Sequence, residues 1–259
     1  MDAICDDTAA EHAVLDALVA GLDEDGWDTP TPSAGWTVRD QISHLWFFDQ
    51  RALMAMTDAE AFEADKARLL AGPTVTDASV EPGRAMSGAA LLDAWRADRE
   101  RLLAEARHLD PSARVAWYGP SMAARSFITA RLMETWAHGQ DVVDALGASR
   151  PATARLKHVA HIGVRARPFS YAIHGKAVPE VDVHVRLRGP DGDEWTWNDP
   201  SSADVVAGDA LDFCLVVTQR RHVDDTDLEI SGEAASEWIS IAQAFAGPPG
   251  PGREPLRDR

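Results

Sequence analysis

The segment RSFITARLMETWAHGQDVVDALG, residues 125–147, decides the fold because its apolar positions recur at the spacing of an α-helix. Residues three and four apart share a helix face. The helix therefore carries a carboxylate and an imidazole, Glu134 and His138, on the side that also holds Phe127 and Ala145. An unpaired charge inside a protein is costly, so this stripe is compatible with a metal site, but taken alone it is more often a surface Glu–His pair at i, i+4.

Three more helices are predicted upstream. Apolar residues recur at helical spacing within residues 9–22, and Thr37 and Ser87 are N-cap residues of helices that extend to about residues 56 and 109. The helix that opens this section is expected to begin near Ser121, and a short extra helix is expected at residues 61–70. Four long helices with an extended second connection predict a four-helix bundle over residues 1–150.

The sequence pattern changes after residue 150. Alternating residues at 181–187 and 194–198, joined by a Gly-Pro-Asp-Gly turn, predict a β-hairpin. Helices are expected at residues 153–166, 210–218 and 233–245, and short strands at 203–206 and 228–230. The fold class is therefore mainly α: a bundle domain at 1–150, a smaller α+β domain at 151–247, and a flexible tail at 248–259.

A second helix supplies a companion for the Glu–His pair. His44 lies on the flank of the apolar stripe of the helix that Thr37 caps. A lone histidine there is usually a satisfied core residue, but His44, Glu134 and His138 together form a His₂Glu set with an open coordination position, the catalytic pattern for zinc. Asp141, one turn beyond His138, is a candidate general base or hydrogen-bond partner of His138.

Other candidates are weaker. His158 and His161 lie three apart without a paired carboxylate, and Arg220-Arg221-His222 follows an apolar helix. The arginines either stabilise the carboxyl end of that helix or bind a substrate carboxylate. The sequence contains no G-x-S-x-G, Walker or G-x-G-x-x-G motif. It therefore does not support an assignment as a serine hydrolase, a P-loop NTPase or a Rossmann enzyme.

Composition restricts the partners. The chain has 259 residues and a formal net charge of −17, from 25 Lys+Arg and 42 Asp+Glu. Such a surface repels nucleic acids and anionic membranes. With two separated cysteines, no signal peptide and no run of some 20 apolar residues, the protein is expected to be cytoplasmic, and to act on a small molecule as a monomer or homodimer.

Two motifs resemble a known family. Residues 31–45, TPSAGWTVRDQISHL, and residues 134–147, ETWAHGQDVVDALG, are similar to the two signatures of the mycothiol-dependent maleylpyruvate isomerase N-terminal domain, a branch of the DinB-like metal-binding bundles. The family patterns are T-P-x-x-G-W-T-V-R-D-x-x-x-H-L and E-x-W-x-H-G-x-D. The resemblance implies that His44, Glu134 and His138 bind a divalent metal, zinc above all, and that mycothiol is the cosubstrate.

The second half also resembles a subgroup of this family. Segments such as 167–171, 212–220 and 244–250 are similar to relatives often labelled wyosine base formation proteins, a label that implies transfer-RNA modification and that the net charge of −17 argues against. The α+β part resembles the sterol-carrier-like domain of the isomerase, which implies that Arg220, with Arg221 beside it, completes the active site in the cleft between the domains.

Three functions are compatible with these residues. The first is an isomerase or S-transferase in which a metal-activated thiol attacks a small, carboxylate-bearing electrophile. The second is metal-dependent hydrolysis through an activated water, with Asp141 as base. The third is a non-catalytic metal-binding module.

Overall fold

The computed structural model describes residues 1–72, 75–250 and 252–256. The chain folds into two compact units, Met1–Arg150 and Pro151–Arg259. None of the helices in these ranges combines the length and apolar character that a membrane crossing needs. The expected mainly helical N-terminal domain, followed by a region with a small mixed sheet and helices, is confirmed.

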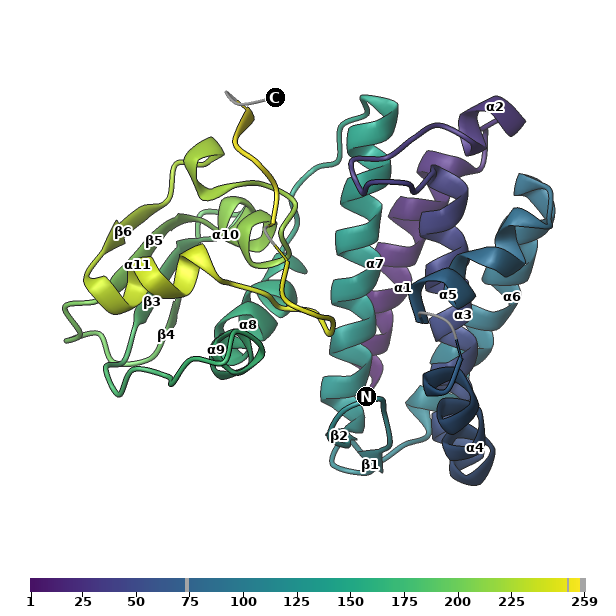
Figure 1. The fold of residues 1–259 in the computed structure, drawn as a ribbon, viewed down its shortest axis with the longest axis horizontal. Coiled ribbons are helices and arrows are strands. Elements are labelled where there is room, and N and C mark those ends of the chain that lie inside the picture. The colour runs from purple at the N-terminus through teal and green to yellow at the C-terminus, as the bar shows by residue number, and fades with distance from the viewer. Residues whose placement is uncertain (73–74, 251, 257–259) are drawn as a thin grey trace. The chain divides into compact units, whose positions relative to one another are not determined.

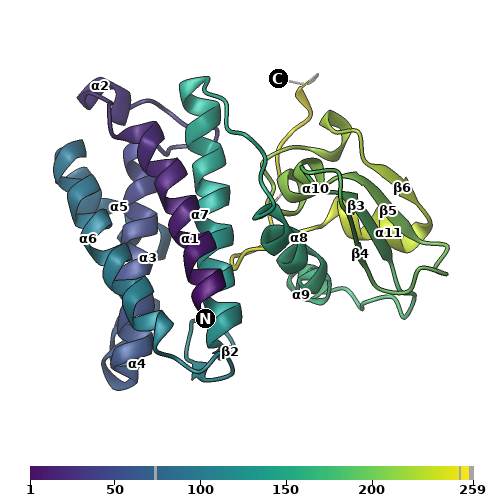
Figure 2. The same cartoon turned by 180° about the vertical axis from the view of Figure 1, so that it is seen from behind.

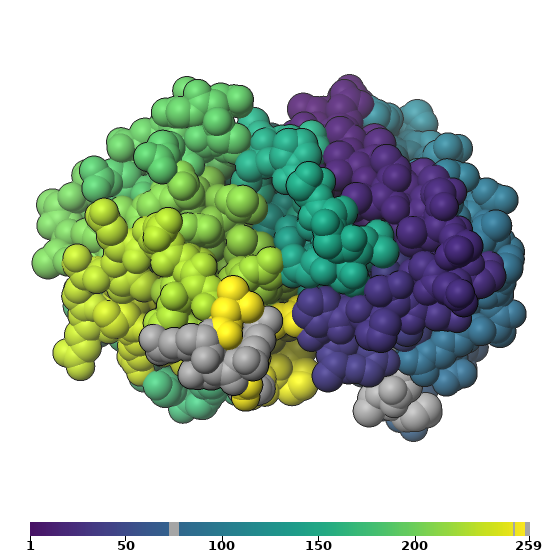
Figure 3. Space-filling view, turned by 90° about the horizontal axis from the view of Figure 1, so that it is seen from above, coloured from purple at the N-terminus to yellow at the C-terminus, as the bar shows by residue number. Residues whose placement is uncertain are grey.

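Unit 1 is a helical bundle. Its four long helices lie side by side, and α3 packs against α5, α6 and α7 while α1 packs against α6 and α7 (Figure 1). The first and last parts of this unit, purple and teal, therefore lie next to each other at its surface (Figure 3). The elements are α1 (Asp2–Val19), α2 (Glu24–Trp27), α3 (Val38–Thr57), α4 (Ala59–Leu70), α5 (Val75–Arg84), α6 (Gly88–Arg107), β1 (Arg114–Val115), β2 (Met122–Ala123) and α7 (Ala124–Leu146).

The bundle core forms where the apolar stripes meet. Burial of such side chains stabilises a fold by roughly 1.5–3 kcal/mol each, and Trp27 and Trp95 are the largest of them. The core cluster consists of Leu15, Val19, Trp27, Val38, Ile42, Leu45, Leu91, Leu92, Trp95 and Val142.

Two helix starts show how local chemistry sets the boundaries. The predicted N-cap Thr37 is part of a full capping box: its hydroxyl accepts from Asp40 N–H, and the Asp40 carboxylate accepts from Thr37 N–H at 3.0 Å. The last helix of the bundle begins at Ala124 rather than Ser121, because Met122 and Ala123 instead pair with β1.

Unit 2 contains a four-stranded sheet in the order β4-β3-β5-β6. The predicted hairpin pairs β3 with β4 in antiparallel fashion, whereas β3 and β5 are parallel. Helix α10 packs against β3 and β5, and α11 against β6 (Figure 2). The elements are α8 (Leu156–Arg165), α9 (Arg167–Ile173), β3 (His184–Arg188), β4 (Glu194–Trp197), β5 (Val205–Asp209), α10 (Ala210–Val217), η1 (Val223–Asp225), β6 (Glu229–Ser231) and α11 (Glu233–Ser240).

The C-terminal part of unit 2 differs from the prediction at the end of the last helix. The last helix ends at Ser240 and not at residue 245, because the chain leaves it to donate from Ala244 N–H to Val217 O at 2.8 Å. In the predicted tail 248–259, residues 251 and 257–259 lie outside the described residues. Leu256 N–H donates to the Asp225 carboxylate at 3.0 and 3.1 Å.

Candidate metal centre

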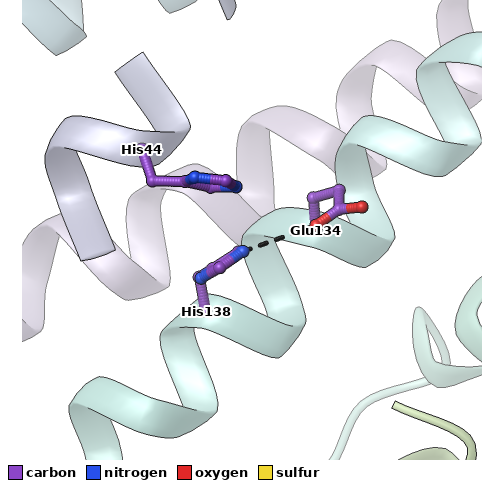
Figure 4. A group of neighbouring side chains, drawn as sticks. All are labelled: His44, Glu134 and His138. Atoms are coloured by element: carbon purple, nitrogen blue, oxygen red, sulfur yellow. Dashed lines mark ion pairs between the residues drawn. The ribbon is translucent and has the colours of Figure 1, made fainter. Parts of the chain in front are cut away.

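Three side chains converge between α3 and α7. His44 comes from α3, and Glu134 and His138 come from adjacent turns of α7 (Figure 4). One ligand atom of each lies within 4.8 Å of the others. His138 Nε2 is 3.4 Å from Glu134 Oε2, and the two imidazole centroids are 4.5 Å apart. The structure therefore brings together the three residues that the sequence predicts as ligands.

This donor set suits a divalent metal. Two imidazoles and one carboxylate are ligands that Zn²⁺ and related ions accept. Two ligands at about 2.1 Å from a tetrahedral ion lie roughly 3.4 Å apart, which matches the His138–Glu134 separation of 3.4 Å. The side chains of His138 and Glu134 are 11% and 22% exposed, so the group is sheltered and still reachable from solvent. The triad could therefore bind a metal.

Each imidazole is held through its other nitrogen. His138 Nδ1 lies 2.6 Å from Gln41 Oε1, and His44 Nδ1 lies 2.9 Å from Ser79 Oγ on α5. Metal-binding histidines usually make such a hydrogen bond, which fixes the ring orientation and presents Nε2 to the ion. Gln41 and Ser79 are fully buried. Sequence analysis missed both residues, because only the folded bundle shows which polar side chains meet the rings.

The metal ligands are surrounded by aromatic rings. Trp36 stacks on His138 with an interplanar angle of 15° and centroids 5.9 Å apart. Phe48 lies 4.7 Å from the ring of His44 and is itself in edge contact with Trp117 and Tyr118. Such rings exclude water and strengthen electrostatic interactions at the site. Sequence analysis assigned no site role to any of them.

Two half-buried polar side chains, Tyr118 and Arg51, adjoin this aromatic group. Burial raises the pKa of Tyr118 to about 12, although the positive charge of Arg51 opposes the shift. Partial burial lowers the pKa of Arg51, whose guanidinium lies 3.1 Å from the carboxylate of Asp65. Tyr118 therefore stays a neutral phenol at physiological pH.

Two charged residues of α7 make polar contacts near the ligands. Arg131, one turn before Glu134, pairs with Asp49 at 2.9 Å. Asp141 is fully buried and accepts a hydrogen bond from Ser33 Oγ at 3.0 Å. A role for Asp141 as base or as a partner of His138 stays a prediction.

The remaining candidates lie in unit 2. Arg220 is 8% exposed, donates from Nη1 to Thr218 O at 2.6 Å and lies over the ring of Phe245. Its assignment to substrate binding stays a prediction. His161 accepts from Trp197 Nε1 at 3.2 Å. Within the described residues, His44, Glu134 and His138 are the group whose geometry could hold a metal.

Comparison with known proteins finds a matching family model and two similar proteins. The family model of the mycothiol maleylpyruvate isomerase N-terminal domain matches residues 8–143. Uncharacterized proteins from two strains of Mycobacterium tuberculosis are each 49% identical over 249 residues, 95% of this chain and 96% of theirs.

Solved structures show the same fold. The crystal structure of the mycothiol-dependent maleylpyruvate isomerase superposes with a TM-score of 0.58 at 15% identity, covering 85% of this chain and 89% of that chain. A mutant of that enzyme gives a TM-score of 0.59 at 15% identity, over 86% and 90% of the two chains. At this identity the likeness extends to the fold alone.

Proposed function

Because the chain belongs to the mycothiol maleylpyruvate isomerase N-terminal domain family, we propose that it is a metal-dependent enzyme that acts with a low-molecular-weight thiol on a small electrophile. One observation carries the proposal: His44, Glu134 and His138 offer ligand atoms within 4.8 Å of one another, and both imidazoles are oriented through Nδ1. A Glu–His pair that only stabilised the helix would need neither a second imidazole beside it nor a hydrogen bond at each Nδ1.

The residues of the site would have two different roles, metal binding and formation of the apolar surroundings. His44, Glu134 and His138 would hold a divalent metal, Zn²⁺ in our proposal. That metal would act as a Lewis acid that lowers the pKa of a thiol such as mycothiol from its usual value of about 8.5. Trp36 and Phe48, whose rings contact His138 and His44, would form apolar walls beside the ligands.

Reaction type and substrate follow from the same chemistry. A thiolate adds to an electrophilic double bond, and the outcome is isomerisation if the thiol leaves again or S-transfer if it stays. Arg220, the residue that resembles the family's arginine, would bind a substrate carboxylate, because a guanidinium fork recognises carboxylates in bidentate fashion.

The proposal is tested by metal content and thiol dependence. The protein, purified without chelators, is expected to contain stoichiometric metal by elemental analysis. His44→Ala, Glu134→Ala and His138→Ala are each expected to lose the metal and to keep the helical circular dichroism of the bundle. His108→Ala is the matched control, because His108 is exposed at the end of α6.

Activity is measured on a panel of electrophiles, including maleyl-type carboxylates, with mycothiol, with glutathione and without thiol. Turnover is expected only in the presence of a thiol. Full metal content in all three ligand variants would contradict the site, and turnover that is independent of thiol would contradict the reaction.

A further inference from the structure

We propose that Gln41 is a positioning residue that holds His138 in the tautomer protonated at Nδ1, and that Thr31 fixes the orientation of Gln41. The inference rests on the proposed function only in taking His138 as a metal ligand. The tautomer itself is a property of the metal-free chain.

The direction of the hydrogen bonds is set at a backbone carbonyl. Trp36 O can only accept, and it receives the hydroxyl proton of Thr31 at 2.9 Å. The single hydroxyl proton of Thr31 is thereby used, so Thr31 Oγ1 acts as an acceptor toward the Gln41 side-chain nitrogen, also at 2.9 Å. The amide of Gln41 must then point its nitrogen at Thr31 and its oxygen at His138.

The reverse orientation of the Gln41 amide is unfavourable. The amide oxygen would then need the hydroxyl proton of Thr31, and Thr31 Oγ1 and Trp36 O would face each other as two acceptors at 2.9 Å. Because Gln41 is fully buried, water cannot compensate for such a mismatch. The orientation therefore follows from hydrogen-bond chemistry.

The consequence reaches the metal site. Gln41 Oε1 can only accept, so His138 Nδ1, 2.6 Å away, must be the donor. A neutral imidazole carries one proton, which leaves the lone pair on Nε2, the atom 3.4 Å from Glu134. For His44, the hydrogen bond with Ser79 does not by itself define the tautomer, because a hydroxyl can donate or accept.

The loop that supplies Thr31 and Trp36 is itself fixed. Thr31 N–H also donates to Trp36 O, at 2.8 Å, and Pro30 forms an isolated β-bridge with Thr37. Gly35 has a φ of +78°, a left-handed conformation that favours glycine. This loop conformation therefore holds Thr31 in place for its hydrogen bond to Gln41 in the metal-free protein.

Long-range ¹H–¹⁵N NMR of the metal-free protein, recorded at about pH 8 and thus above the ordinary histidine pKa of about 6.5, tests the tautomer. Wild-type His138 is expected to be protonated at Nδ1. Thr31→Val keeps the side-chain shape and removes the hydroxyl. In this variant and in Gln41→Leu, a fraction of His138 is expected to be protonated at Nε2 instead. Thr31→Ser keeps the hydroxyl and is expected to give the same His138 signals as the wild type.

The second readout is Zn²⁺ affinity by competition with a chelator. Loss of the hydrogen bond that a metal-binding histidine makes through its other nitrogen typically lowers the metal affinity about 10- to 100-fold. Gln41→Leu and Thr31→Val are therefore expected to weaken Zn²⁺ binding within that range. Thr31→Ser is expected to bind as wild type. Thr129→Val is the matched control, because the Thr129 hydroxyl donates within α7 to Arg125 O at 2.8 Å.

The two proposals fail in different ways. A wild-type His138 protonated at Nε2 would overturn the inference, as would a Thr31→Val protein whose tautomer and Zn²⁺ affinity are both unchanged. Absence of Zn²⁺ binding by the wild type would instead contradict the proposed function, while the NMR experiment would still decide the role of Gln41. If Gln41→Leu does not fold, Thr31→Val carries the test alone.

Discussion

His12 is a buried histidine without a hydrogen-bonding partner. Its side chain lies in α1 and is 2% exposed, and neither ring nitrogen has a partner within the described structure. The ring contacts Trp95 edge-on at 5.6 Å. Burial lowers the pKa of His12 to about 4; the nearby Asp49 opposes this shift, and Arg99 and Arg131 add to it. The folded bundle therefore favours the neutral form of His12.

The pH dependence of stability follows from this shift. In the unfolded chain His12 titrates near the ordinary histidine pKa of 6.5, and in the folded chain its pKa is about 4, so between these values the unfolded state binds more protons. Stability therefore falls as the pH decreases through this window. We expect His12 to reduce the free energy of unfolding by about 2 kcal/mol between about pH 7 and about pH 5.

Urea unfolding of the wild type and of His12→Leu at both pH values checks this expectation. Leucine has a similar volume and no titrating group, so the variant is expected to lose that part of the pH dependence and to be at least as stable at the lower pH. His108→Gln, at an exposed position, is the control. An equal pH dependence in wild type and His12→Leu would show that His12 titrates alike in both states.

At the residue scale, helical periodicity predicted that three side chains of two helices could face one another, and the structure brings them together. Glu134 and His138 share a helix face by spacing alone, and His44 lies on a second helix with a clear N-cap. The residues that hold the rings could not be predicted in this way. Gln41 is a neighbour of His138 only after α3 packs on α7, and Ser79 belongs to a helix that was not expected.

Helix α5 was missed because its sequence argues against a helix. Pro82 lies inside it and supplies no N–H. The structure shows how the helix is held nonetheless: the hydroxyl of Ser43 accepts from Gly83 N–H at 3.0 Å and donates to Ser79 O at 2.9 Å. These are the two groups that an uninterrupted helix joins directly. Ser43 thus fixes α5 in the position from which Ser79 reaches His44.

Gly83 is required for this contact. A Cβ atom at Gly83 would lie 2.4 Å from Ser43 Cβ and 2.6 Å from its Oγ. We expect Gly83→Ala to lower the free energy of unfolding by about 1–3 kcal/mol, the usual cost of overpacking. Because Ser79 moves with α5, the variant is also expected to bind Zn²⁺ more weakly than wild type. Denaturant unfolding and Zn²⁺ competition measure the two effects.

Gly21→Ala is the matched control for this substitution, because a Cβ there would meet nothing within 4 Å. It is expected to change stability by less than about 0.5 kcal/mol. A Gly83→Ala protein as stable and as tight in Zn²⁺ binding as Gly21→Ala would show that α5 does not depend on the close approach of Ser43.

At the scale of the molecule, the change of pattern after residue 150 predicted the two kinds of structure but not the sheet order. A hairpin is local, so β3 and β4 were predictable from a turn between alternating segments. The parallel pairing of β3 with β5 joins strands separated by β4, and α10 packs against both of them, so this pairing depends on contacts between segments that are distant in the sequence. Short strands such as β6 carry too few residues for their partner to be predicted.

The structure shows which carboxylates pair with some of the basic side chains of this acidic chain. Several of the cations in a protein of net charge −17 are committed to carboxylates. Arg39 pairs with Glu24 and Asp28, and Arg96 and Arg99 both pair with Asp16. Cations engaged in this way are poor contacts for a phosphate backbone, because binding would first have to break the internal pairs.

We therefore expect no measurable binding of transfer RNA at about 0.15 M salt, where the Debye length is about 8 Å. RNA binding depends on cationic neutralisation of phosphates and on release of their counterions, and a chain with 42 acidic against 25 basic side chains opposes both. Fluorescence anisotropy with labelled transfer RNA, repeated at low and high salt, measures this. Because electrostatic binding weakens steeply with salt, micromolar affinity that declines in that manner would reveal a basic surface that the net charge conceals, and would support a transfer-RNA substrate over a small electrophile.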